Sequence, residues 1–293
     1  MMATKKQATV KVQKSSMFLE FCQRLVKSWS SKIGLFLMLF IILACVIGPY
    51  LTGYELNWQD QSLMRAAPSA KHILGCDTLG RDMLTRLLYG GRYSLMMGIL
   101  SAVLGAVLGI AIGLVASYFG GITETIIMRF MDVWSSLPGM LLCILVSAAM
   151  GNGFLATVIA LTIGSIPGGA RMTRGQVLAE RSKEYIEAAE SINCSKLSIM
   201  FKHLLPNVIQ PSIVITTMSV GSTINMAASL SYIGLGIQPP APEWGAMLAD
   251  GKSYIMTDPH LIAVPGIAIA LTVLAINLLG DGLRDALDPK LRS

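Results

Sequence analysis

The chain has 293 residues, of which 53% are hydrophobic and 14% charged, and its mean hydropathy is +0.61. This composition excludes a water-soluble globular protein and indicates an integral membrane protein. The net charge of +6 does not by itself indicate nucleic-acid binding, because the basic residues must first be placed relative to the membrane.

The N-terminal segment, residues 1–32, carries seven Lys or Arg against one acid, Glu20. The apolar run that follows, residues 33–51, is longer than a signal-peptide core and has no small-residue cleavage site after it. We therefore predict a retained transmembrane helix, and the positive-inside rule places the N-terminus in the cytoplasm.

Five further apolar runs each supply roughly the 20 residues that a helix needs to cross a bilayer. They cover residues 94–118, 125–149, 154–172, 208–232 and 262–280. The predicted fold class is an all-α membrane protein with six transmembrane helices, and six crossings return the C-terminus to the cytoplasm.

The distribution of basic residues agrees with this topology. Sixteen Lys or Arg lie in the N-terminal segment, the loop from Arg171 to Asn207 and the stretch from Arg284 to the end, and six lie in the outer segments 52–93 and 233–261. Topology therefore explains the basic excess, and we predict no nucleic-acid partner. The predicted organisation is a cytoplasmic segment (1–32), a first helix (33–51), an extracytoplasmic segment (52–93), a five-helix core (94–284) with a cytoplasmic loop (173–207), and a cytoplasmic tail (285–293).

The sequence indicates neither a disulfide framework nor a metal site. Its five cysteines are an odd number, widely spread and without a CxxC pair. His72 stands near Asp77 in the outer segment, but two ligands do not make a metal site. The cysteines are Cys22, Cys45, Cys76, Cys143 and Cys194.

The end of the outer segment combines turn residues with charge. Gly75 and Gly80 mark turns. The charged side chains of Arg81, Asp82 and Arg86 are expected to pair at the rim of the membrane.

Two features inside the spans call for an explanation. Gly105, Gly109 and Gly113 recur every four residues, which predicts close packing of the second helix against a neighbour. Asp132 lies three residues after Arg129 in the third span, where the two can pair. We favour an interfacial anchor for this pair over a proton relay.

Residues 184–207 form a mixed-charge stretch between two spans and are predicted to fold as two short surface helices. Asn193 tolerates the left-handed turn between them, Ser195 can cap the second helix, and Pro206 is expected to end it. The predicted apolar faces are Tyr185, Ala188, Ala189 and Ile192 in the first helix, opposite Glu184, Glu187 and Glu190, and Leu197, Met200, Phe201 and Leu204 in the second.

The fifth span carries a stripe of hydroxyls spaced four, three and four residues apart: Ser212, Thr216, Ser219 and Thr223. An uncharged hydrogen-bonding wall of this kind suits a translocation path, and the alternative is that the hydroxyls bond to helix carbonyls. A second polar face, Ser222, Asn225 and Ser229, leaves the side that faces the path open.

No catalytic or nucleotide-binding apparatus is predicted. Residues 246–253 read A-M-L-A-D-G-K-S, which lacks the first glycine of a phosphate-binding loop and lies outside the cell by the topology above. We expect a non-enzymatic protein without a cofactor of its own. Near the end of the sixth span, Asn277, Asp281 and Arg284 are expected to brace the cytoplasmic mouth.

The central stretch resembles the "EAA" loop of permease subunits of ATP-binding-cassette importers, except that Asn193 stands where that family usually has glycine. The resemblance implies that the loop docks into a cleft on a separate ATPase. The residues it marks for this coupling are Glu184, Glu187, Ala188, Ala189, Asn193, Leu205 and Pro206.

Three further strings resemble the dipeptide, oligopeptide and nickel branch of that family: residues 72–95, 230–245 and 277–289. The resemblance implies the type I importer permease fold in the plasma (inner) membrane of a bacterium or archaeon. It also implies a second, related permease subunit, two ATPase subunits that bind ATP and Mg²⁺, and an external substrate-binding protein.

The substrate remains open among dipeptides, oligopeptides, glutathione and nickel chelates, with peptides favoured. The rival from another class is a secondary carrier or channel that works without ATP. Such a protein predicts broken helices paired in matching halves, whereas Pro138, Pro167 and Pro265 are scattered.

Overall fold

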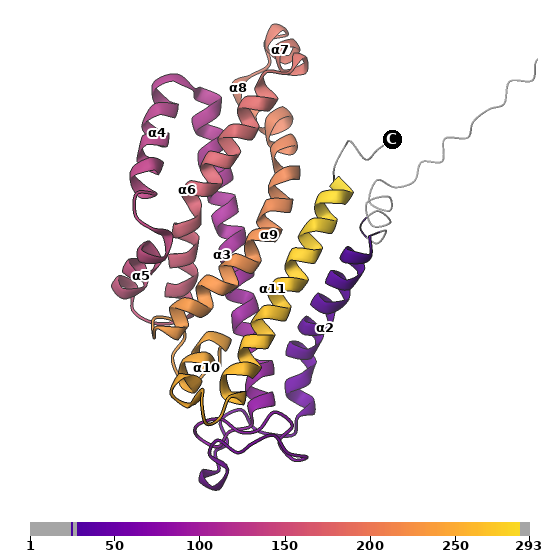
Figure 1. Cartoon of the computed structure of the whole chain (residues 1–293). Helices are drawn as coiled ribbons and strands as arrows, with labels where there is room; N and C mark the ends of the chain where they lie inside the picture. Colours follow the sequence, from indigo (N-terminus) through magenta and orange to yellow (C-terminus); the bar gives the residue numbers. More distant parts are fainter. Residues whose placement is uncertain (1–24, 26–27, 288–293) are drawn as a thin grey trace, which may run out of the picture.

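The computed structural model describes residue 25 and residues 28–287, which are mostly helical and include no β-strand. Predictions for Cys22, most of the N-terminal segment and the tail beyond residue 287 lie outside these residues. The helices form an elongated bundle (Figure 1). They are α2 (Trp29–Leu51), η1 (Gln61–Leu63), α3 (Met83–Phe119), α4 (Gly121–Trp134), α5 (Gly139–Met150), α6 (Phe154–Arg181), α7 (Glu184–Ser191), α8 (Lys196–Ser198), η2 (Ile199–Leu204), α9 (Leu205–Tyr232), α10 (Trp244–Gly251), η3 (Lys252–Tyr254) and α11 (His260–Leu287).

Among the described residues, five helical segments are long and apolar enough to cross a membrane. These are α2, α3, α6, the continuous run from α8 to the end of α9, and α11. The pair α4 and α5 is apolar enough only as a unit, and its two halves meet at 82°. The expectation of one straight helix over residues 125–149 is therefore wrong.

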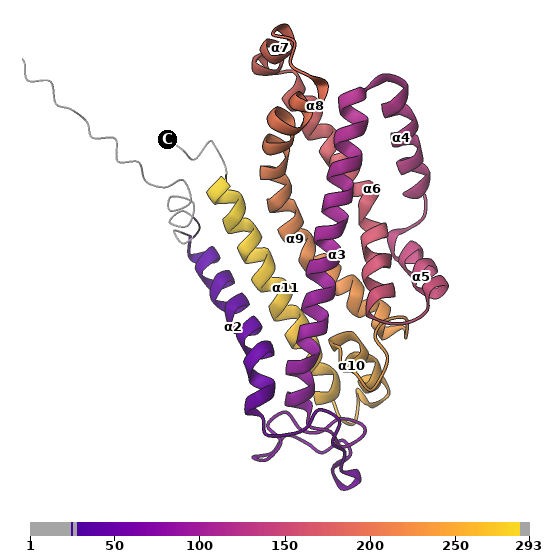
Figure 2. The same cartoon turned by 180° about the vertical axis from the view of Figure 1, so that it is seen from behind.

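Proline chemistry explains the break between α4 and α5. Pro138 has extended backbone angles, φ −54° and ψ 132°, and α5 begins at the next residue. A proline disfavours the helical conformation of the residue before it, here Leu137, so one helix cannot run through this stretch. Helix α4 ends at Trp134 and the chain turns before α5 begins. Figure 2 shows α4 and α5 at the side of the bundle, against α6.

Two helices run further than the hydropathy of the sequence predicts. Helix α3 begins at Met83 rather than near residue 94, because the Asp82 carboxylate accepts hydrogen bonds from the backbone N–H of Thr85 at 2.8 Å and caps the helix. Helix α6 continues past residue 172 to Arg181. Charged residues in both extensions pair with neighbouring elements, Arg86 with Asp77 and Arg174 with Glu124.

The two ends of the bundle differ in structure. Helices α7 and α8 project from one end, toward which α2 begins and α11 finishes (Figure 1). The loops of residues 52–82 and helix α10 cover the other end (Figure 2). Helices α7 and α8 and both ends of the described chain therefore lie at the same end of the bundle.

The most extensive helix contact is between α3 and α6, and the predicted glycine stripe makes it. A side chain added at Gly109 would lie 2.9 Å from Gly169 Cα, and one at Gly113 would lie 2.5 Å from the Ala170 carbonyl oxygen. At Gly105 it would overlap the Ser165 hydroxyl. The packing prediction is confirmed, since small residues let two helices approach where lipid offers no hydrophobic drive.

Replacing Gly109 with valine should destabilise the protein by about 1–3 kcal/mol, because backbone atoms of α6 cannot move aside as a flexible side chain could. Thermal unfolding of the purified protein measures the loss. Gly175→Val is the matched control, since Gly175 is helical with no atom within 4 Å of an added Cβ. Equal losses at the two positions would contradict the packing account.

Candidate coupling elbow and polar surfaces

The elbow, defined as α7, α8 and η2, turns where the sequence predicts. Asn193 has φ +60°, in the left-handed region, and its N–H donates to the Glu190 carbonyl at 2.9 Å. The Cys194 N–H donates to the Ala189 carbonyl at 3.1 Å, which closes the end of α7. The Ser195 hydroxyl then accepts from the Ser198 N–H at 3.3 Å and caps α8.

The buried faces of the elbow differ from the prediction. In α7 the inward side chains are Ile186 and Ala189, while Tyr185, Ala188 and Ile192 are exposed, Ile192 by 77%. In the second half Met200 and Leu204 are buried as expected, but Leu197 and Phe201 are 62% and 54% exposed. The buried elbow side chains pack with residues of α3, α6 and α9: Leu114, Tyr118, Val177 and Val208.

This correction follows from tertiary contacts. Ile186 stands among glutamates, so helical periodicity assigned it to no apolar face. It is buried because α7 packs on Leu114 of α3 and Val177 of α6, and this contact fixes the rotation of α7 about its axis. The apolar side chains on the opposite surface are left without a cover in this chain.

The second expected surface helix is not separate from the fifth span. The π-helical turn η2 leads directly into α9, with the Leu205 N–H bonded to the Met200 carbonyl. Pro206 lies in the first turn of α9 and does not end the helix, because the π-helical turn before it keeps the helix continuous. The run from α8 to Tyr232 is one helical segment.

The residues marked for coupling occupy distinct environments. Glu184, Glu187 and Ala188 are exposed on α7, as is Asn193 at the turn. Ala189 is buried in the cluster, and Leu205 is half-buried against it. Pro206 is exposed at the start of α9.

A polar network joins the elbow to α6 and α9. The Tyr185 hydroxyl donates to Glu180 at 2.8 Å and accepts from the Asn207 amide at 3.2 Å. Burial, followed by the bond to Glu180, raises the pKa of Tyr185 to about 12, so the phenol stays protonated. The Lys183 ammonium pairs with Glu180 at 2.5 Å.

Arginines of α6, which the sequence analysis did not single out, connect this end of the bundle. Arg181 donates to the Tyr118 carbonyl at 3.2 Å, where α3 ends, and Arg174 pairs with Glu124 of α4 at 2.5 Å. Arg171 bonds the Ser135 hydroxyl at the α4–α5 break. The spacing of these arginines, three and seven residues apart, places them on one side of α6, and this was the sequence signal from which their contacts could have been predicted.

The hydroxyl stripe of α9 bonds within its own helix. Ser212, Thr216, Ser219 and Thr223 each donate to a carbonyl three or four residues earlier, at 2.7–2.8 Å. They border a cavity of about 280 Å³ between α3, α6 and α9. Ser212 itself is buried and contacts Gln176 of α6.

Two of the three residues of the second polar face of α9 border a larger cavity, of about 860 Å³, whereas Ser222 lines the smaller one. Asn225, Ser229 and Tyr232 contribute from α9, and Asn277 contributes from α11. Helix α10 closes one end with Leu248. Asn277, expected at the cytoplasmic mouth, therefore lies beside this cavity.

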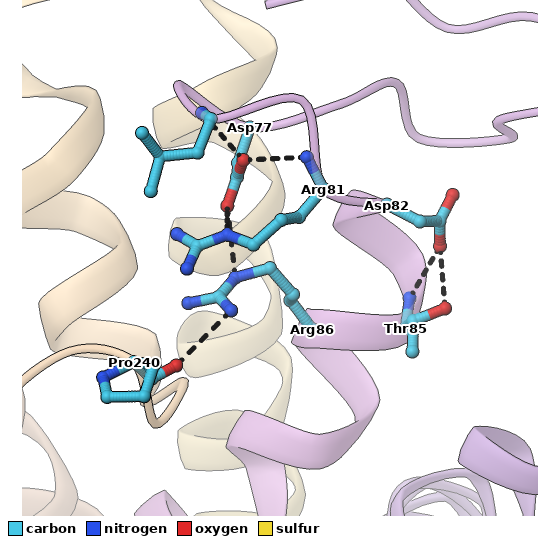
Figure 3. A network of polar contacts seen from close by, with 7 residues as sticks. Asp77, Arg81, Asp82, Thr85, Arg86 and Pro240 are labelled. Carbon is cyan, nitrogen blue, oxygen red and sulfur yellow. Dashed lines mark hydrogen bonds and ion pairs between the residues drawn. The ribbon is translucent and has the colours of Figure 1, made fainter. Parts of the chain in front are cut away.

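A buried ion network holds the other end of the bundle (Figure 3). The Asp77 carboxylate pairs with Arg81 Nε at 2.7 Å and Arg86 Nε at 3.1 Å, and the Arg86 guanidinium donates to the Pro240 carbonyl at 3.3 Å. The expected pairing of these arginines with Asp82 is wrong. Asp82 instead accepts from Thr85 and contacts His72 Nδ1 at 2.9 Å.

Glu243 is a further buried carboxylate, which the sequence analysis missed. It is 0% exposed and accepts from the Ser94 hydroxyl at 2.8 Å and from the Ala246 N–H at 2.9 Å. It caps α10 and ties it to α3. The segment that resembles a phosphate-binding loop is this helix and the turn η3 after it.

The pair in α4 lies on the surface. Arg129 Nη1 is 3.9 Å from Asp132 Oδ2, and the two side chains are 81% and 50% exposed. This is a long, exposed contact, and such pairs contribute little to stability.

Comparison with known proteins decides the family. The sequence profile described as binding-protein-dependent transport system inner membrane component matches residues 83–293. The chain belongs to this family. A second profile, the N-terminal transmembrane domain of oligopeptide transport permease C, matches residues 16–68. The family consists of permeases of ATP-binding-cassette transporters, which are non-catalytic membrane subunits served by separate ATPases.

Relatives match over nearly the whole chain. The glutathione transport system permease protein GsiD of Pectobacterium atrosepticum is 46% identical over 89% of this chain and 86% of its own length. The di/tripeptide transport system permease protein DppC of Pseudomonas aeruginosa is 41% identical over 94% of this chain and 92% of its own. This chain is thus related to permeases of glutathione and di/tripeptide transport systems.

A solved structure supports the fold alone. The inward-facing MetNI methionine ABC transporter has a chain that aligns with a TM-score of 0.59 and 21% identity, covering 70% of this chain and 98% of that one.

Asp77→Asn should destabilise the permease by about 3–5 kcal/mol, because it leaves two buried guanidinium groups without their carboxylate. Denaturant unfolding in detergent measures the effect. The control is Asp258→Asn, whose pair with Arg65 is partly exposed and should contribute no more than about 1 kcal/mol. A loss at Asp77 as small as the control's would show that the network does not hold this end.

Proposed function

We propose that the chain is the permease subunit of an ATP-driven importer of short peptides, glutathione among them, in the inner membrane of a bacterium. The observation that carries this proposal is the continuity of the elbow with α9. The names of the relatives favour peptides over nickel chelates, which the resemblance also allows.

The elbow is suited to transmit force from an ATPase. Its outer surface combines the acids Glu184 and Glu187 with exposed Ala188 and Ile192, a surface that a cleft on a soluble partner can cover. Its inner surface packs on α3, α6 and α9. A push on the elbow therefore moves packed helices together, and a two-state switch needs such rigid bodies.

The assembly follows from this assignment. The elbow faces the cytoplasm, with both chain termini on the same side and six crossings that count α4 and α5 as one broken span. A second, related permease completes the pathway, two ATPases bind the elbows, and a substrate-binding protein delivers peptide to the end that carries α10. ATP and Mg²⁺ are bound by the ATPases.

The residues that line the cavity between α9 and α11 form one wall of the translocation path in this proposal. The amide groups of Asn225 and Asn277 on this cavity can bond a peptide backbone without a charge that would hold it, whereas the Ser229 hydroxyl donates to the Asn225 carbonyl of its own helix. The stripe from Ser212 to Thr223 bonds its own helix, and we assign it to packing and to the smaller cavity.

Ala188→Glu should abolish ATP-driven uptake in membrane vesicles while the protein still inserts, since Ala188 is exposed and its replacement leaves the buried cluster intact. Ala189→Glu should instead destabilise the elbow. The control is Thr125→Glu, which adds the same acid on an exposed turn of α4 at the same end. Full ATP-dependent uptake by the Ala188 variant would overturn docking through this surface.

Asn225→Leu should lower the maximal rate of peptide uptake several-fold without weakening ATPase binding, because it removes hydrogen-bonding capacity from the path. Thr217→Val serves as the control, since the Thr217 hydroxyl donates to the Ile213 carbonyl of its own helix. The measurement is initial uptake rate against substrate concentration. Equal rates for both variants would place the path elsewhere.

A further inference from the structure

Arg92 of α3 lies within a membrane-spanning helix and compensates a defect in α2. Pro49 has no N–H, so the Cys45 carbonyl four residues earlier lacks its helical donor. Arg92 Nε donates to that carbonyl at 2.8 Å, and Nη2 donates to the Val46 carbonyl at 2.8 Å. The arginine therefore joins the two helices across 47 residues of sequence.

The positive charge of Arg92 is not neutralised by these bonds. No carboxylate of the described residues forms an ion pair with it. Its guanidinium lies against the rings of Tyr89 at 4.9 Å and Tyr50 at 5.4 Å, and it has N–H donors to spare. Tyrosines of this kind mark the headgroup level of a bilayer, and a cation inside a span calls for an anionic partner.

An apolar groove of about 270 Å³ is lined by Cys45, the residue whose carbonyl Arg92 bonds. It runs between α2 and α11 and is lined by Phe40, Ala44, Leu88, Trp244, Ile267 and Leu271. Leu88 is one turn from Arg92 on α3. A cation one helical turn from an apolar groove matches a phosphodiester joined to an acyl chain.

We propose that Arg92 and the α2–α11 groove form a binding site for an anionic phospholipid of the outer leaflet. The lipid phosphate bonds the remaining guanidinium donors between Tyr50 and Tyr89, and one acyl chain lies along Phe40, Ala44 and Leu271. The bound lipid neutralises the charge of Arg92 and fills the seam between the first and last helices of the chain.

The test uses phosphatidylglycerol and phosphatidylcholine with a photoactivatable group on the acyl chain. The full-length chain, with the subunits that co-purify with it, is placed in nanodiscs, and mass spectrometry locates the adducts. Adducts in the groove should favour phosphatidylglycerol about fivefold, the ratio expected for one charge near an anionic partner. Adducts at Leu141 and Leu145, exposed on the uncharged helix α5, report general lipid contact.

Two variants separate the parts of the site. Arg92→Gln should abolish the preference for phosphatidylglycerol, and Arg92→Lys should keep most of it. Ala44→Phe fills the groove without touching Arg92 and should remove the groove adducts while those on α5 persist. Equal labelling by the two lipids, groove adducts unchanged by Ala44→Phe, or a groove that no lipid reaches because another subunit covers it would each overturn the proposal.

Discussion

The contact of α3 with α6 is the constraint on which the rest of this permease depends. In a bilayer, apolar helices gain little by leaving lipid for one another, so close association needs small residues and satisfied polar groups. Gly109 and Gly113 bring the α3 backbone against Gly169 and Ala170. Arg181 then fixes the end of the pair next to the elbow by bonding carbonyls in the last turn of α3. The elbow packs on the platform that these two helices make.

The buried and half-buried charged groups of the bundle discussed above are each committed to a partner. Asp77 holds two arginines, Glu243 caps α10, and Arg92 replaces the donor that Pro49 lacks. The hydroxyls of α9 bond carbonyls of their own helix. The polar groups beside the large α9–α11 cavity include the amides of Asn225 and Asn277, and this is why the path is assigned to that side.

The sequence predicts this architecture where a single residue type or a short spacing carries the signal. The left-handed turn at Asn193, the cap at Ser195 and the glycine stripe are local properties, and all three are confirmed. Hydropathy also locates the apolar runs, but it cannot place the bend at Pro138, because a broken span is as apolar as a straight one. Pro206 was misjudged because a π-helical turn before it keeps the helix continuous.

Other features depend on contacts between distant parts of the chain. The rotation of α7 is set by Leu114 and Val177, so the helical pattern alone selected the wrong face. Arg86 finds its acceptor at Pro240, 154 residues away. The family resemblance marks residues 184–207 as the coupling loop, whereas the division of its side chains between the protein's own core and an uncovered surface came only from the packing.

The uncovered surface of the elbow is the centre of this account, and Ile192, 77% exposed, tests it most directly. A photoreactive amino acid at this position should crosslink to the ATPase subunit, with a yield that changes when ATP is added. Crosslinks only to lipid or to this chain, in a complex that still contains the ATPase, would show that the elbow does not receive the force of ATP hydrolysis.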